Sequence, residues 1–289
     1  MCELFGITAN RKIKVNDLLK RFFEHSVEHR NGWGLALLDD NSVSIEKEPV
    51  KASDSLYLKN RLTGRVETSR CMAHIRRATV GDVSFSNTHP FSKRDESGRT
   101  WVLVHNGTIF ESPILSAYQY KQHGTTDSER MLLYLVDHIN KHYFNEMNSF
   151  DANDRIRIVD QLIKRIVPEN KDNLMIYDGD YFYVHKNEAG TLYKSERAGS
   201  VIFSTHPLTV DGWEEVPQNQ LFVYKDGELI TDSSRYSITY KWNATNIALT
   251  NTSGTPIDPA GVSNSMVLAR GTGVIDENSS VSFEHWVKV

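Results

Sequence analysis

The sequence predicts an α+β fold in which helices pack on antiparallel sheets. Strand-like segments come first along the chain, two long amphipathic helices follow, and strand-like segments then return. Asp-Gly pairs at 178–179 and 226–227 separate short apolar segments, where such pairs are typical of two-residue hairpin turns. Strands that are grouped, rather than alternating one by one with helices, indicate antiparallel pairing.

The first part of the chain alternates between strand and helix patterns. Residues 2–9 are mostly apolar and predict a strand at the N-terminus. Leucines and phenylalanines recur at helical spacing over 15–28, where Asn16 is the expected N-cap. Next we expect a hairpin of strands 33–38 and 42–47, and then a short helix over 53–62.

The middle of the chain predicts two strands joined by a long polar stretch. The strands are 70–77 and 101–105, and residues 79–100 lie between them. A connection this long is typical of a functional loop, so we expect 79–100 to be an ordered loop.

Two long helices follow. Residues 126–144 combine a cap at Thr126 or Asp127 with an apolar face at helical spacing. A second helix over 151–167 stops before Pro168. The remaining expected strands are 174–177, 181–185, 191–194, 201–205, 221–224 and 228–230.

The composition changes at Tyr240. Of the last 50 residues only 7 are charged, and 22 are Ser, Thr, Asn, Gly or Pro. We therefore expect a main domain over 2–239 and a C-terminal extension over 240–289 that is either β-rich or loosely ordered.

Charge and cysteine content exclude several classes of protein. The net charge of −4 gives no basic surplus, so neither a nucleic-acid nor a membrane partner is expected. No apolar run approaches the roughly 18 residues that would span a bilayer, and the N-terminus does not resemble a secretory signal. Two cysteines cannot form a disulfide framework, which favours a cytoplasmic location.

Cys2 is the first candidate for chemistry. Its small side chain permits removal of Met1, which would leave a thiol and a free α-amine on one residue. An α-amine titrates near about 7.7–8.0, so it can serve as the general base for the thiol beside it. A cysteine here is more often simply a small residue.

Three further motifs each have a functional and an ordinary interpretation. One of the arginines at 76–77 could bind a carboxylate, although such residues at a strand end are usually solvated. Asn106 and Gly107 could together donate to an oxyanion, although Asn-Gly is more often a turn. Asp127 could be only a helix cap.

Taken together and in order, these motifs resemble the class II glutamine amidotransferases, which are N-terminal-nucleophile hydrolases. The similarity extends from Cys2 to about residue 230 and favours the short stand-alone branch of that family. It implies a four-layer α/β/β/α sandwich. The motifs that carry it are CELFG at 2–6, HRNGWG at 29–34, HIRRATVG at 74–81, NTHPF at 87–91, HNG at 105–107, TDSE at 126–129 and STHPL at 204–208.

The resemblance also implies roles for individual residues. Cys2 would form a γ-glutamyl thioester, and Asn106 with Gly107 would form the oxyanion hole. Arg76 would bind the substrate's α-carboxylate with help from Thr79, and Asp127 would bind its α-ammonium.

Three positions depart from the usual family pattern and concern the substrate pocket rather than the nucleophile. Arg77 stands where many members have Trp, and Val80 where many have His. Asn31 stands where the stand-alone branch usually has Asp.

Three functions remain open. The first is a self-contained γ-glutamyl hydrolase. The second is a glutaminase subunit that delivers ammonia to a separate synthase, since 289 residues leave no room for a synthase on this chain. The third is a catalytically silent subunit that binds glutamine. The substrate would be a small molecule, and the partner, if there is one, a synthase or a peptidase subunit.

No cofactor or metal is expected. The pairs His25/His29 and His138/His142 have the spacing of zinc ligands on a helix but lack an evident third ligand, so we interpret them as solvated. Gly271–Gly273 lacks the full dinucleotide-binding pattern. Cys71 lies inside a predicted strand and is expected to be a buried apolar residue.

Overall fold

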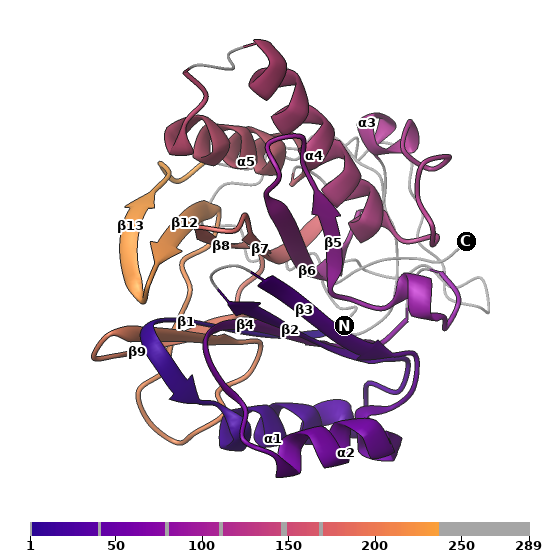
Figure 1. Ribbon diagram of the computed structural model, residues 1–289, viewed down its shortest axis with the longest axis vertical. Coiled ribbons are helices and arrows are strands. Elements are labelled where there is room, and N and C mark those ends of the chain that lie inside the picture. Colours follow the sequence, from indigo (N-terminus) through magenta and orange to yellow (C-terminus); the bar gives the residue numbers. More distant parts are fainter. Residues whose placement is uncertain are drawn as a thin grey trace, which may run out of the picture. The chain divides into compact units, whose positions relative to one another are not determined.

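Two antiparallel sheets face each other and carry helices on their outer sides (Figure 1). The computed structural model describes residues 2–39, 42–78, 81–109, 112–145, 149–167 and 170–236. They belong to one compact unit, Met1–Tyr236. The predicted extension over 240–289 lies outside the described residues.

The first sheet has seven strands, and its central strand begins directly after Cys2. This strand contacts a neighbour on each side in antiparallel register. The order across the sheet is β11 (Glu214–Glu215), β9 (Tyr193–Arg197), β10 (Ser200–Ser204), β1 (Glu3–Lys14), β4 (Glu67–Ile75), β2 (Trp33–Asp39) and β3 (Ser42–Glu48).

The second sheet has six strands and contains both arms of each predicted Asp-Gly hairpin. The order is β13 (Glu228–Asp232), β12 (Gln220–Lys225), β8 (Phe182–Lys186), β7 (Lys171–Tyr177), β6 (Thr100–Thr108) and β5 (Phe91–Arg94). Both hairpins turn at a glycine of positive φ, 90° at Gly179 and 80° at Gly227, as their sequence predicts.

Helices form the two outer layers. On the seven-stranded sheet lie α1 (Asn16–Glu24) and α2 (Leu56–Thr63), and on the six-stranded sheet lie α4 (Asp127–Asn145) and α5 (Ala152–Ile166) (Figure 1). The predicted four-layer α/β/β/α arrangement is therefore confirmed. The short elements are α3 (Pro113–Ser116) and the 3-10 turns His25–Val27, Ala52–Asp54 and Phe85–Asn87.

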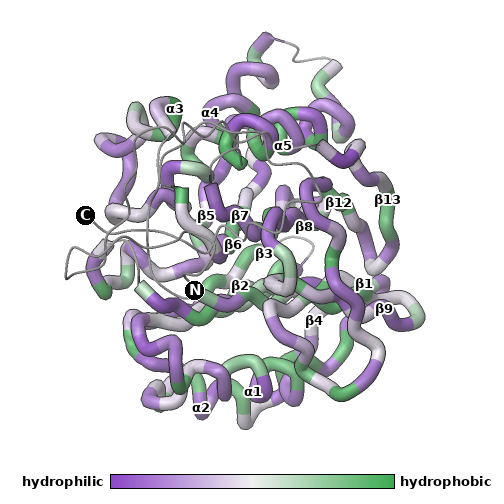
Figure 2. Tube along the Cα trace, turned by 180° about the vertical axis from the view of Figure 1, so that it is seen from behind, coloured by the Kyte–Doolittle hydropathy of each residue, from purple (hydrophilic) through white to green (hydrophobic). Residues whose placement is uncertain are grey.

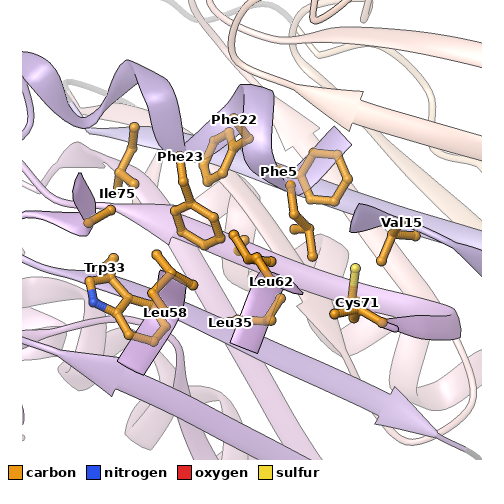
Figure 3. Packing of buried hydrophobic residues seen from close by; sticks show 14 of the residues in the cluster. Phe5, Val15, Phe22, Phe23, Trp33, Leu35, Leu58, Leu62, Cys71 and Ile75 are labelled. Carbon is orange, nitrogen blue, oxygen red and sulfur yellow. The ribbon is translucent and has the colours of Figure 1, made fainter. Parts of the chain in front are cut away.

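Apolar packing occurs on both faces of the first sheet. Toward α1, the rings of Phe22 and Phe23 lie against Phe5 and Trp33 (Figure 3). A separate cluster between the two sheets contains Leu4, Met72, Val102 and Val104, among others. Burying each such side chain stabilises the fold by about 1.5–3 kcal/mol. The helices carry both hydrophobic and hydrophilic stretches, as expected for helices with one buried side (Figure 2).

Alternation along the strands decides which side chains enter the space between the sheets. In β1, Leu4 belongs to the inter-sheet cluster and Phe5 to the cluster under α1. In β6, Val102 and Val104 face the other sheet. Alternation therefore predicts that Cys2, two positions before Leu4, and Asn106, two positions after Val104, face the same inter-sheet space.

Three local predictions were wrong. Asn16 is not the N-cap: Val15 precedes the helix, and the buried Asn16 amide instead bonds to the end of α2 and to the residues between α2 and β4. Residues 79–100 are not only a loop, because they include β5, which pairs with β6. The strand expected over 70–77 ends at Ile75, so both arginines lie beyond it.

Candidate functional site

Cys2 is held at the start of β1 by its neighbours on both sides. Thr205 donates its backbone N–H to Leu4 O at 3.0 Å and accepts the Leu4 N–H on its hydroxyl at 2.9 Å. The Cys2 thiol donates to Arg77 O, and Arg77 N–H donates to Cys2 Sγ, both at 3.4 Å. The nucleophile candidate is thus fixed between β10 and the residues that follow β4.

Arg76 leaves β4 with its side chain buried. Its guanidinium donates to Asp82 O at 2.9 Å and Gly81 O at 3.2 Å. Its backbone exchanges hydrogen bonds with Asn31 and Gly32: Asn31 N–H donates to Arg76 O at 3.0 Å, and Arg76 N–H donates to Gly32 O at 2.8 Å. The HRNGWG motif therefore positions the arginine through its backbone.

Asn106 is a buried polar side chain whose amide has no hydrogen-bond partner in the described part of the chain. It is only 2% exposed, yet neither Oδ1 nor Nδ2 has a hydrogen-bond partner among the described residues. Burying an amide without a partner costs about 1–3 kcal/mol, so such a group calls for an explanation. A bound ligand that hydrogen-bonds to Asn106 would supply one.

Gly107 lies beside Asn106 inside β6, so the two residues do not form a turn. A Cβ added to Gly107 would lie 2.0 Å from Lys171 O on the neighbouring strand β7. Only glycine lets β6 and β7 pair at this point. The ordinary interpretation of the Asn-Gly pair is wrong, because this pair is part of a strand.

Asp127 is the first residue of α4, and its carboxylate is buried. Oδ2 accepts Ile109 N–H at 2.7 Å, and Oδ1 accepts Ser128 N–H at 2.9 Å. The actual cap is Thr126, whose hydroxyl accepts Glu129 N–H at 3.3 Å. Asp127 therefore does more than cap the helix, and the helix N-terminus favours its negative charge.

Electrostatics link these groups to the thiol. Burial raises the pKa of Cys2 above its ordinary value, opposed by the Arg77 backbone and the Arg76 charge, while the Asp127 charge raises it further. Burial lowers the pKa of Arg76, and the charge of an ionised Cys2 opposes that shift. Arg76 and Asp127 are thus close enough to influence the nucleophile, which is a neutral thiol at rest.

A layer of buried histidines was not predicted as part of the site. His74 contacts His105 O through Nε2 at 3.2 Å, which ties β4 to β6 across the two sheets. Burial lowers the pKa of His74 to about 3, and its ring stacks on His89 with centroids 4.1 Å apart. The only sequence signal was that HIRR, NTHP and HNG each contain a histidine.

The interpretation of His25 and His29 as solvated was wrong for His29, and His25 is only partly exposed. His29 is buried, and His25 Nδ1 contacts the buried carboxylate of Glu3 at 2.8 Å. His29 Nδ1 and His206 Nε2 lie 3.7 and 3.8 Å from the same carboxylate. Sequence spacing could not reveal this, because Glu3 and His206 come from distant parts of the chain.

Other predicted positions are accounted for as follows. Thr79 and Val80 lie outside the described residues, and so do 271–273. Cys71 is buried in the core cluster under α1, as predicted. Among the described residues, no set of three or more His, Cys, Asp or Glu side chains could hold a metal ion. None of the helices in this part of the chain is long and apolar enough to cross a membrane.

Comparison with known proteins places this site in a family context. The model for glutamine amidotransferases of class II matches residues 1–197. An uncharacterized protein of Methanocaldococcus jannaschii is 30% identical over 263 residues, covering 81% of this chain and 72% of that protein.

Solved structures share the fold. A glutamine phosphoribosylpyrophosphate amidotransferase from Bacillus subtilis matches with a TM-score of 0.60 and 16% identity, over 84% of this chain and 50% of that one. A glutamine aminotransferase class-II domain protein from Silicibacter pomeroyi matches with a TM-score of 0.53 and 16% identity, over 82% of this chain and all (100%) of that one.

Proposed function

The chain belongs to the class II glutamine amidotransferases, and on that premise we propose that it hydrolyses a γ-glutamyl amide bond through a thioester on Cys2. The observation that carries the proposal is the buried amide of Asn106, which has no hydrogen-bond partner among the described residues and which strand alternation directs toward the same inter-sheet space as Cys2. A developing oxyanion is a ligand that would satisfy this amide.

In the first half-reaction, the Cys2 α-amine exposed by loss of Met1 takes the thiol proton. The sulfur attacks the γ-carbonyl carbon, and the carbonyl electron pair moves to oxygen. That oxygen accepts hydrogen bonds from Asn106 Nδ2 and Gly107 N–H. The α-ammonium of Cys2 then protonates the leaving nitrogen, the C–N bond breaks, and the γ-glutamyl thioester remains.

In the second half-reaction, water attacks the thioester carbon and gives a proton to the same α-amine. The C–S bond breaks, the thiolate regains a proton, and glutamate leaves. The net reaction consumes one water and releases glutamate with ammonia or an amine. The raised pKa of Cys2 supports the need for a nearby base, because a neutral thiol is a poor nucleophile.

Two opposite charges would select the head of the substrate. Arg76 would bind the α-carboxylate, with Thr79 orienting it, and Asp127 would bind the α-ammonium. The substrate class is therefore a γ-glutamyl group with a free amino acid head. Asn31 supports this site indirectly, since its side-chain oxygen accepts Ala78 N–H at 3.0 Å, just beyond the two arginines.

Intact mass spectrometry tests the nucleophile. The purified protein is treated with a diazoketone analogue of L-glutamine, and its mass is compared before and after. We expect loss of Met1, one adduct on the wild type and on Cys71→Ser, and none on Cys2→Ala. An adduct that survives Cys2→Ala would exclude Cys2 as the nucleophile.

Product assays then separate the candidate functions. Release of ammonia from glutamine supports a glutaminase that serves a separate synthase. Release of an amine from γ-glutamyl peptides or thiol conjugates, without glutamine turnover, supports a self-contained cytoplasmic hydrolase. A protein that has lost Met1 but turns over none of these substrates would contradict the proposed reaction and leave a silent binding subunit.

A further inference from the structure

A buried chain of four side chains leads from the six-stranded sheet to Asp127. Asp172 on β7 lies 3.3 Å from His105 Nε2 through Oδ1. His105 Nδ1 lies 3.0 Å from Ser128 Oγ, and Ser128 Oγ lies 3.3 Å from Asp127 Oδ1. All four residues are buried. The chain ends at the carboxylate proposed to bind the α-ammonium.

The neighbouring hydrogen-bond acceptors determine which ring nitrogens of His105 carry protons and where the Ser128 hydroxyl donates. His105 Nε2 faces Asp172 Oδ1 and also Lys171 O at 3.4 Å, so it must carry a proton. When Nδ1 is protonated as well, Ser128 Oγ accepts from it and is free to donate to Asp127. When His105 is neutral, the Ser128 hydroxyl donates to Nδ1 instead, and Asp127 loses one donor.

The surroundings favour the protonated ring. The Asp172 side chain is buried, and its carboxylate oxygens make no hydrogen bond of good geometry among the described residues; the carboxylate lies beside the rings of His105 and His185. Its other neighbour, His185, lies 3.8 Å away, and burial lowers the pKa of His185 to about 4, which keeps that ring neutral. Burial also opposes charge on His105, but Asp172, the Asp127 charge and the Lys171 carbonyl together outweigh it and raise the pKa of His105.

We propose that Asp172, His105 and Ser128 are positioning residues that orient the Asp127 carboxylate toward the substrate's α-ammonium. The inference rests on the proposed function, because it assumes that this carboxylate binds the amino acid head. This series of side chains contacts Asp127 but does not contact Cys2. Breaking it should therefore weaken recognition of the substrate's amino acid head without changing the reactivity of the Cys2 thiol.

Two alkylating probes separate recognition from reactivity. The diazoketone analogue of L-glutamine carries the α-ammonium and α-carboxylate, whereas iodoacetamide carries neither. Second-order rate constants for modification of Cys2 are measured with both probes by intact mass. The variants are Ser128→Ala, Ser128→Thr and Asp172→Asn. Ser26→Ala is the matched control, because Ser26 is a buried serine that takes no part in the series from Asp172 to Asp127.

For Ser128→Ala and Asp172→Asn we expect about a tenfold loss with the diazoketone, the size of one hydrogen bond to a charged group. Their iodoacetamide rate should equal that of the wild type. Ser128→Thr keeps the hydroxyl and should restore the diazoketone rate, and Ser26→Ala should change neither rate.

Several outcomes overturn the inference. Equal diazoketone rates in wild type and Ser128→Ala would show that the hydroxyl does not support Asp127. Parallel loss of both rates would show a general structural effect. If Ser128→Ala does not fold, Ser128→Thr and Asp172→Asn decide alone. Failure of the diazoketone to label the wild type would instead refute the proposed function, so the two failures are distinguishable.

Discussion

Replacing Asn106 with leucine should slow the reaction by about 10²–10³-fold without weakening the fold. Leucine has the same number of side-chain heavy atoms as asparagine but no polar group. Because Asn106 makes no hydrogen bond among the described residues, the substitution breaks none there. If its amide serves only a transition state, stability and activity will respond in opposite directions.

The magnitudes follow from burial and bonding. Removing a buried, unpaired amide relieves part of its burial cost, so the free energy of unfolding should stay level or rise by about 1 kcal/mol. Loss of one oxyanion donor slows the reaction by about 10²–10³-fold, which corresponds to roughly 2.7–4 kcal/mol in the barrier. The Cys2 iodoacetamide rate should not change.

Asn16→Leu is the matched control. Asn16 is equally buried but donates to Leu62 O at 3.0 Å and Gly64 O at 2.7 Å, and it accepts Val66 N–H at 2.9 Å. Losing three hydrogen bonds should lower the free energy of unfolding by about 3 kcal/mol. The folded fraction should keep its full activity.

The assay combines urea unfolding with initial rates of ammonia or amine release at saturating substrate. A destabilisation of Asn106→Leu similar to that of Asn16→Leu would mean that Asn106 has a structural partner. Retention of more than about a tenth of the wild-type rate would remove Asn106 from the oxyanion hole.

Three further outcomes are expected. Iodoacetamide under native conditions should modify Cys2 alone, because Cys71 is buried and burial raises its pKa; peptide mapping that finds modified Cys71 would contradict this. Gly107→Ala should destabilise the protein by about 2 kcal/mol or more in urea unfolding, because its Cβ would lie 2.0 Å from Lys171 O. His74 has a pKa near 3 when folded and 6.5 when exposed, so its contribution to stability is present above about pH 6.5 and lost as pH falls toward 3; His74→Gln should flatten the pH dependence of the unfolding free energy over that range, and an unchanged slope would refute the assignment.

Local patterns predicted much of the fold. Asp-Gly pairs marked both hairpins, and the helix over 126–144 was found as α4 within about one residue at each end. These features depend on interactions between residues close in sequence. The wrong assignments concern residues whose environment depends on contacts distant in sequence. The Asn16 side chain hydrogen-bonds to residues in and after α2, and His29 is buried near Glu3.

For the site, the sequence by itself determined the chemical types and their order: a cysteine at position 2, an arginine after a strand, an Asn-Gly pair and an acidic helix start. Only the tertiary structure decided that β1 and β6 lie in the two facing sheets and that the Asn106 amide has no hydrogen-bond partner among the described residues. Whether a polar group is satisfied depends on chain segments that meet only after folding. Local sequence patterns therefore cannot predict these long-range contacts.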